Sequence, residues 1–171
     1  MRLYQILSYL LGYPQEEWAD FLPDLQQLVA EEDLDEAARE SLRGFLDYVA
    51  KTDMIELQRI YVDTFDLKAQ HSLHLTHHLL GDDKNRGPAL IDLAEYYKAW
   101  GMQSVEGELP DYLPMMLEFA AQIEEEEASL FLSQIGKVLT ILADNLEQGE
   151  SAWAPLVRIA EKRALLTRLA A

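Results

Sequence analysis

The sequence EEEEASLFLSQIGKVLTILADNLEQ, residues 124–148, carries the clearest helical pattern of the chain. Its apolar side chains recur every three or four residues, at Ala128, Phe131, Leu132, Ile135, Val138, Leu139, Leu142 and Leu146. This spacing places them on one face of an α-helix. Four glutamates stand at the start of the stretch, where negative charge stabilises the helix dipole. The stretch therefore predicts a long helix with one buried face.

The same spacing recurs on both sides of this stretch. Further helices are predicted at about residues 1–11, 16–31, 35–51, 54–65, 88–100, 111–120 and 152–169. Asp33 or Asp35, Asp53 and Asp111 are candidate N-caps, and Pro23 is expected to kink or split the second helix. Alternating Val, Ile and Thr runs, which would indicate strands, are absent. We expect an all-α fold, a single-domain bundle of about seven or eight helices spanning residues 1–171.

Composition narrows the class of protein. The 171 residues include 49% apolar and 26% charged residues, as in an ordinary globular protein, and no cysteine. The net charge, 14 − 31 = −17, would repel a phosphate backbone, so we expect no nucleic-acid partner. It would attract basic peptides, or it serves only to keep the protein in solution. No uncharged apolar run approaches about 18 residues, so we expect no insertion into a membrane.

All four histidines fall within eight residues, at His71, His74, His77 and His78. On one continuous helix, the first, second and fourth of them would share a face. Imidazoles at such spacing can bind a transition metal, which makes a metal-binding enzyme the alternative function. A HExxH motif is absent, however. The cluster is otherwise a hydrogen-bonding patch that titrates near neutral pH, or a solvated helix face.

Other signs of catalysis are missing. No serine lies in a G-x-S-x-G elbow, and the glycine-flanked stretch 81–87 lacks the GxxxxGK[ST] pattern of a phosphate-binding loop. The residues alone therefore predict no catalytic residue, no bound cofactor and no metal, and the protein is expected not to be an enzyme.

Aromatic residues flank the histidine cluster: Tyr61, Phe65, Tyr96, Tyr97 and Trp100. Adjacent residues on a helix point about 100° apart, so Tyr96 and Tyr97 cannot both face inward. One of them is expected to line a surface or groove. An apolar groove with an acidic rim suits a basic, amphipathic helical peptide.

Six motifs follow one another in a fixed order. They are YVDTFD at 61–66, HSLHL at 71–75, LGD at 80–82, RGPAL at 86–90, ELPDYLP at 108–114 and LEF at 117–119. This set, dense between about Arg59 and Ala120, resembles the nitrate reductase delta-subunit family of NarJ-type molybdenum cofactor assembly chaperones, within the wider TorD-like group. The sequence LGYP at 11–14, after an apolar helix, also fits this family.

The resemblance implies a function. Such chaperones are all-α, cytoplasmic proteins that bind the immature catalytic alpha subunit of nitrate reductase, partly through its basic, amphipathic N-terminal segment. They support molybdenum cofactor insertion before membrane attachment. A second hypothesis is that the protein is a structural adaptor that joins reductase subunits permanently. The motifs and their flanking aromatics give the expected peptide-binding residues: Tyr61, Phe65, Asp66, His71, His74, His78, Arg86, Tyr96, Tyr97, Glu108, Asp111 and Tyr112.

Overall fold

The long apolar stripe forms the centre of the protein. In the computed structural model, which describes residues 2–81, 83–102 and 107–170, helix α8 spans Glu125–Gln148. Every stripe residue except Ile135, which is half-buried, lies in the core. Helix α9, Ala154–Ala170, packs along α8 after a short connection. The prediction of one long helix with a buried face is confirmed.

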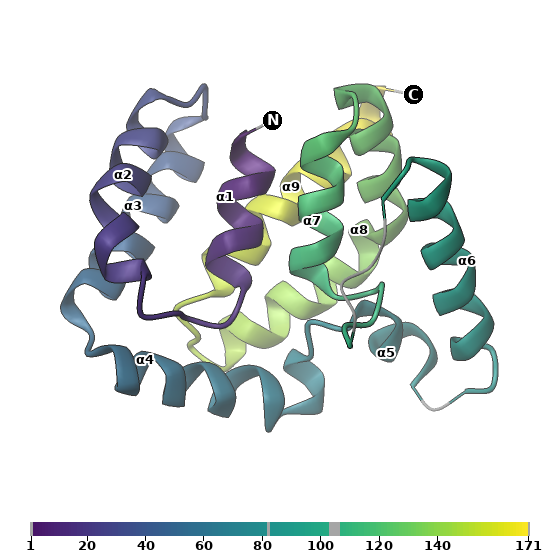
Figure 1. Ribbon diagram of the computed structural model, residues 1–171, viewed down its shortest axis with the longest axis horizontal. Helices are drawn as coiled ribbons and strands as arrows, with labels where there is room; N and C mark the ends of the chain where they lie inside the picture. The colour runs from purple at the N-terminus through teal and green to yellow at the C-terminus, as the bar shows by residue number, and fades with distance from the viewer. Residues whose placement is uncertain (1, 82, 103–106, 171) are drawn as a thin grey trace.

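The described part of the chain is all-α and holds no strand, as predicted (Figure 1). Nine α-helices occur in it, because a short stretch within the histidine segment forms a helix of its own. The remaining helices are α1 Arg2–Leu11, α2 Trp18–Glu31, α3 Glu36–Lys51, α4 Met54–Tyr61, α5 Leu75–Leu80, α6 Arg86–Ala99 and α7 Leu113–Gln122. A π-helical turn at Val62–Asp66 (η1) and a 3-10 turn at Ala69–His71 (η2) lie between α4 and α5.

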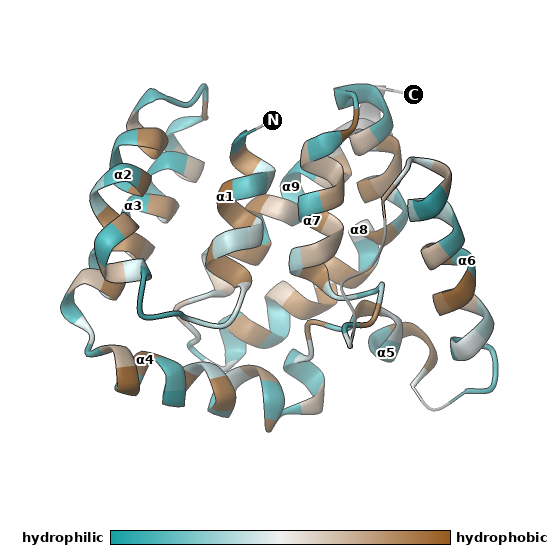
Figure 2. Ribbon diagram, viewed as in Figure 1, coloured by the Kyte–Doolittle hydropathy of each residue, from teal (hydrophilic) through white to brown (hydrophobic). Residues whose placement is uncertain are grey.

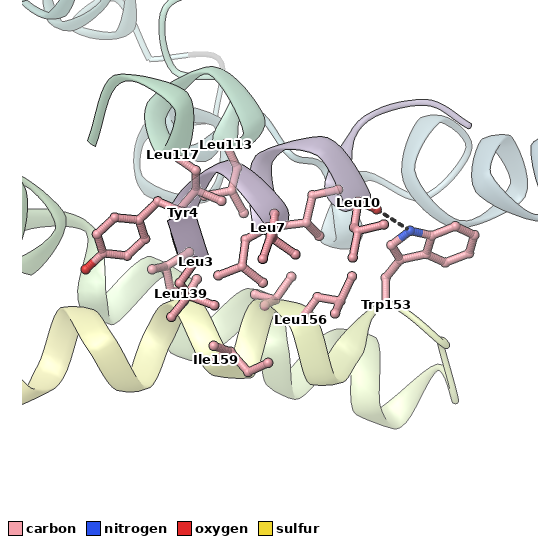
Figure 3. Close-up of a cluster of buried hydrophobic side chains, with 14 of the residues drawn as sticks. Leu3, Tyr4, Leu7, Leu10, Leu113, Leu117, Leu139, Trp153, Leu156 and Ile159 are labelled. Carbon is pink, nitrogen blue, oxygen red and sulfur yellow. Dashed lines mark hydrogen bonds between the residues drawn. The ribbon is translucent and has the colours of Figure 1, made fainter. Parts of the chain in front are cut away.

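Helix α1 is buried in the middle of the bundle, against α7 and α9 (Figures 1 and 3). Leu7 and Leu10 of α1 are fully buried and point toward Leu156 of α9. Trp153, at the start of α9, is also fully buried, and its indole Nε1 donates a hydrogen bond to the Leu10 carbonyl at 3.1 Å. The ring of Phe45, on α3, lies 5.5 Å from that of Trp153. Trp153 thus joins α1, α3 and α9.

Helices α2 and α3 form a hairpin at one side of the bundle (Figure 1). Asp35 caps α3 by accepting a hydrogen bond from the Ala38 N–H, and Asp53 caps α4, as predicted. Pro23 lies inside α2 without splitting it, contrary to one of the two expected outcomes. Pro23 is the sixth residue of α2, so its missing N–H cannot bond to the Ala19 carbonyl, and both residues are exposed on the solvent side of the helix.

Helix α6 lies at the opposite side and packs on the bundle through aromatic rings (Figure 1). Tyr97 is buried, with its ring 4.8 Å from that of Phe119 on α7. The ring of Tyr96 stacks on that of Phe131 on α8, at 5.7 Å. Colouring by hydropathy shows polar and apolar residues mixed around α6, whereas those of α1 segregate more clearly (Figure 2). Aromatic stacking therefore takes the place of a continuous apolar face.

Candidate peptide-binding site

The histidine segment is not one continuous helix, contrary to the assumption behind the metal-binding alternative. His71 ends the 3-10 turn η2, residues 72–74 are extended, and α5 begins only at Leu75. The extended part pairs with the ELPDYLP motif, since His74 and Tyr112 form an antiparallel bridge. Two backbone hydrogen bonds flank this bridge: Leu75 N–H to the Asp111 carbonyl, and Leu113 N–H to the Leu73 carbonyl. Backbone pairing thus brings two of the sequence motifs together.

Asp111 is the centre of this junction. The prediction that Asp111 caps the following helix is wrong, because Tyr112 is the N-cap residue of α7. Its carboxylate instead turns toward the first turn of α5, where Oδ2 accepts hydrogen bonds from the Thr76 N–H at 3.0 Å and the Thr76 hydroxyl at 2.5 Å. Arg86 Nε in turn donates to the Thr76 hydroxyl oxygen at 3.1 Å. The buried carboxylate therefore ties the start of α7 to α5 and, through Thr76, to α6.

His74 places a titratable ring between two carboxylates. Its Nδ1 lies 3.4 Å from Asp111 Oδ1, and its Nε2 lies 3.8 Å from Glu108 Oε1. Asp111 and, more weakly, Glu108 raise the pKa of His74 above its ordinary value, although partial burial opposes this. Burial alone would raise the pKa of Asp111, but interactions with His74 and Thr76 hold it below its ordinary value. The pair therefore favours imidazolium beside carboxylate.

A tyrosine pair extends this network toward the core. The Tyr61 hydroxyl donates to the Leu11 carbonyl at 2.9 Å and lies 3.1 Å from the Tyr112 hydroxyl. Burial raises the pKa of Tyr61 far above its ordinary value and also raises that of Tyr112. Both hydroxyls therefore stay protonated and serve as hydrogen-bonding groups.

The other two predicted histidines have separate partners. His71 is buried, and its ring nitrogens each lie 3.1 Å from a backbone carbonyl, those of Thr64 and Asn145. His78 Nε2 lies 2.7 Å from the Ser72 carbonyl, and burial lowers the pKa of His78. Within the described residues, no group of three or more His, Asp or Glu side chains is placed to hold a metal ion. The geometry gives the metal-binding alternative no support.

A cavity of about 350 Å³ opens beside the network, between α5, α6, α7 and α8. Its walls are mainly apolar, and Asp92 and Asp111 supply carboxylates. Tyr96 lines this cavity while Tyr97 is buried, so the two tyrosines divide as the helical spacing predicts. The apolar lining consists of Leu75, Leu79, Ala89, Leu93, Tyr96, Met116, Phe131 and Ile135.

The twelve expected site residues separate into three groups. Six belong to the connected network: Tyr61, His74, Arg86, Glu108, Asp111 and Tyr112. Three more shape the surroundings as buried residues: Phe65, His71 and Tyr97. Tyr96 and His78 are half-buried, and Asp66 is exposed. The structure thus brings half of the set into one network, and the buried members can only support a surface.

Comparison with known proteins gives a consistent result. A family model described as nitrate reductase delta subunit matches residues 31–158. The chain belongs to this family. It is 38% identical over 157 residues to the probable nitrate reductase molybdenum cofactor assembly chaperone NarJ of Bacillus subtilis (strain 168), covering 91% of this chain and 84% of the relative. It is 34% identical over 160 residues to the nitrate reductase molybdenum cofactor assembly chaperone NarJ of Escherichia coli (strain K12), covering 93% and 68%.

A third relative is a much longer protein, and the chain matches only part of it. The nitrate reductase-like protein NarX of Mycobacterium tuberculosis (strain ATCC 25618 / H37Rv) is 31% identical over 155 residues, which are 91% of this chain and 23% of that protein. No helix in the described part of the present family member is long and apolar enough to cross a membrane.

Sequence reasoning missed several residues that build the site of this delta-subunit family member. Thr76 bridges Arg86 and Asp111, and the Asn145 side chain donates to the Gln70 carbonyl at 3.0 Å. Gly149 leaves room for His71, because a Cβ at Gly149 would lie 2.8 Å from His71 Cε1. Thr76 lies inside the histidine segment and could have been noticed, whereas the contacts of Asn145 and Gly149 join segments more than 70 residues apart.

Proposed function

We propose that this protein is a client-specific assembly chaperone for a respiratory nitrate reductase. It acts in the cytoplasm, binds the immature catalytic alpha subunit, and supports insertion of the molybdenum cofactor before the reductase attaches to the membrane. The similarity to two proteins named as such chaperones, over 91% and 93% of this chain, carries the proposal. The chain acts as a binding protein and not as an enzyme, in keeping with those names.

The client is recognised partly through the basic, amphipathic N-terminal segment of its alpha subunit. The apolar cavity beside α6 has the size and lining to take side chains from one face of a short helix. Tyr96, His74, Glu108 and Tyr112 are accessible around it, while the buried members of the site hold these in place. The net charge of −17 speeds the encounter with a basic segment, so affinity falls as salt rises.

The first test is capture of the immature alpha subunit. The full-length chaperone is co-purified with an alpha subunit that retains, or lacks, its first ~15 residues, enough for about four helical turns. Capture that weakens on truncation supports recognition of this segment. Absence of any capture would overturn the chaperone proposal, and finding the protein in purified mature reductase would favour a permanent adaptor.

The second test locates the peptide by calorimetric titration with a synthetic N-terminal segment. Tyr96→Ala removes a cavity wall, and we expect binding to weaken about tenfold, as for an interface anchor. Ile55→Ala, at an exposed apolar residue on α4 outside the cavity and the network, is the control and should stay within about twofold. Equal affinities for the Tyr96 variant and the unaltered protein would place the segment elsewhere.

A further inference from the structure

The acidic charge of this protein is concentrated in α2 and in the segments that directly precede and follow it, whereas α1 contains no Asp or Glu. Between residues 3 and 38 the sequence contains nine Asp or Glu and no Lys or Arg. These 36 residues therefore carry −9 of the total charge of −17. The stretch from 75 to 100, which contains α5 and α6, has four acidic and three basic residues, a net charge of −1. The cavity beside α6 is thus not where most of the charge lies.

An apolar groove runs between α1 and the acidic helix α2. Helix α1 packs on α7 and α9, and α2 packs on α3, so α1 and α2 stand side by side without such close packing (Figure 1). The space of about 320 Å³ between them is lined by Ile6 and Tyr9 from α1 and by Leu25 and Leu28 from α2, with Arg2 and Gln5 at the α1 side.

The groove continues into exposed aromatic surface. Phe21 lies on the same α2 face as Leu25 and Leu28, at i, i+4 and i+7, and is 50% exposed. Tyr9 is 36% exposed, with its ring 5.4 Å from that of Trp18. Leu25 is buried and Leu28 is partly buried, so a half-exposed phenylalanine on the same face extends the apolar floor beyond what the fold covers.

Acidic side chains flank the floor. Asp24 is exposed one helical turn before Leu28, and Glu31 is exposed one turn after it. Near the α1 N-terminus, a second hollow of about 270 Å³ is lined by Glu32, Asp33 and Glu125, together with Leu3, Tyr4 and one cation, Arg163. Carboxylates thus lie beside the apolar floor along α2 and just after the C-terminus of α2.

We propose that the α1–α2 groove is a second docking surface, whose occupant is an amphipathic α-helix with an apolar stripe flanked by Lys or Arg. The apolar stripe would cover Phe21, Leu25 and Leu28, and the cations would meet Asp24 and Glu31. Helix α2, Trp18–Glu31, extends about 21 Å, so some 14 residues of helix match its length. The inference is independent of the proposed peptide site beside α6, which lies at the other side of the bundle (Figure 1).

The test uses a designed, fluorescently labelled 14-residue helix with leucines on one face and lysines beside them. Fluorescence anisotropy gives its affinity for the full-length protein. The double variant Asp24→Lys/Glu31→Lys is expected to weaken binding at least about tenfold, since like charges then face each other across the interface. The matched control, Glu40→Lys/Asp47→Lys, makes the same change of +4 at two exposed α3 positions and should stay within about threefold.

A second pair of variants tests the apolar floor. Phe21→Ser should weaken binding about fivefold or more, whereas Ile55→Ser, at a more exposed residue on α4, should have no effect. Equal losses in both lysine doubles, or none in either, would overturn the groove as the site. If Tyr96→Ala abolished binding of the designed helix, the helix would occupy the cavity beside α6. That result would overturn the second surface while leaving the proposed chaperone function intact.

Discussion

Trp153 and Trp100 stand in two regions of the molecule that are held together in different ways. Trp153 is fully buried, and the rings of Phe45, Tyr61 and Phe65 lie within 5.6 Å of its own. Trp100, at the end of α6, is 42% exposed and meets Phe119 at 6.5 Å. The first region is a close-packed apolar core. The second is an edge of helices α5 and α6, attached by a few rings and one polar network.

The difference between these regions indicates that the core supplies stability and the edge can change conformation. A core that fills its space resists change, because any altered volume is felt by its neighbours. An edge joined by few contacts opens at a smaller cost in free energy, and binding sites are commonly drawn from such regions. The α5–α6 edge, which carries the candidate peptide-binding site, is therefore the part we expect to adjust to a client.

The largest difference in stability is expected when a tryptophan is replaced by alanine in the core and at the edge. Trp153→Ala removes a fully buried ring and its hydrogen bond to Leu10, and should lower the free energy of unfolding by about 3–5 kcal/mol. Trp100→Ala at the exposed edge should cost less than about 1 kcal/mol. Urea denaturation followed by circular dichroism measures both. Similar losses for the two variants would contradict the division into core and edge.

Asp111→Ala tests what attaches the edge. The substitution leaves the partly buried Thr76 N–H and hydroxyl without their charged acceptor, so a loss of about 2–3 kcal/mol is expected. The loss should appear as faster hydrogen exchange in α5 and α6, with α8 and α9 protected as before. Exchange that rises equally throughout the chain would mean that the edge and the core unfold together. Asp92→Ala, at an exposed carboxylate of the same cavity, is the control.

Gly149→Ala tests a contact between the two regions. A Cβ at Gly149 would lie 2.8 Å from His71 Cε1, so the histidine must move, at an expected cost of about 1–2 kcal/mol. At Gly44, inside α3, a Cβ would meet nothing within 4 Å. Gly44→Ala should therefore stabilise the protein by about 0.5–1 kcal/mol, the usual gain for alanine in a helix. The two changes should shift the urea midpoint in opposite directions.

Tyr97→Phe removes only one hydroxyl from the underside of α6. This hydroxyl donates to the Pro110 carbonyl at 2.7 Å in a buried place, and its loss should cost about 1 kcal/mol. Tyr96→Phe, the adjacent tyrosine, has no such bond among the described residues and should change stability by less than about 0.5 kcal/mol. Thermal unfolding of both variants distinguishes them, and equal shifts would argue against the Pro110 bond.

The sequence predicts the core better than the edge, for a physical reason. Residues 124–148 form a helix because their own spacing demands one, and Asp35 and Asp53 cap the helices that follow them directly. The behaviour of Asp111 depends on Thr76, 35 residues away, whose backbone N–H needed an acceptor. A local rule, that an aspartate before a helix caps it, was therefore wrong there.

The assumption of a continuous helix through the four histidines was wrong for the same reason. The spacing of the histidines suits a helical face, but backbone pairing with residues 111–113 keeps His74 extended, so that α5 begins only at Leu75. The tyrosines of α6 could be assigned from spacing alone, because one of two neighbours must face outward. Partners that are far apart in the sequence can be identified only from the three-dimensional structure. The candidate site is built almost wholly from contacts of this kind.

The smallest effect expected is the pH dependence of the edge. The pKa of His74 is raised in the folded protein, mainly by Asp111, so its imidazolium stabilises the fold. This contribution is fully present below the ordinary value of 6.5 and is lost as the pH rises through the raised value. Because the ring is 33% exposed, solvent screening keeps the contribution small.

The free energy of unfolding is measured for the unaltered protein and for His74→Gln from about pH 5.5 to about pH 9, a range that includes the ordinary pKa of histidine. Burial lowers the pKa of His78, which therefore opposes His74, but His78 is present in both proteins and its effect cancels in the difference. The stability advantage of the unaltered protein should shrink steadily with rising pH. An advantage that grew with pH would mean that neutral His74 is the stabilising form, and the contact with Asp111 would then not act as an ion pair.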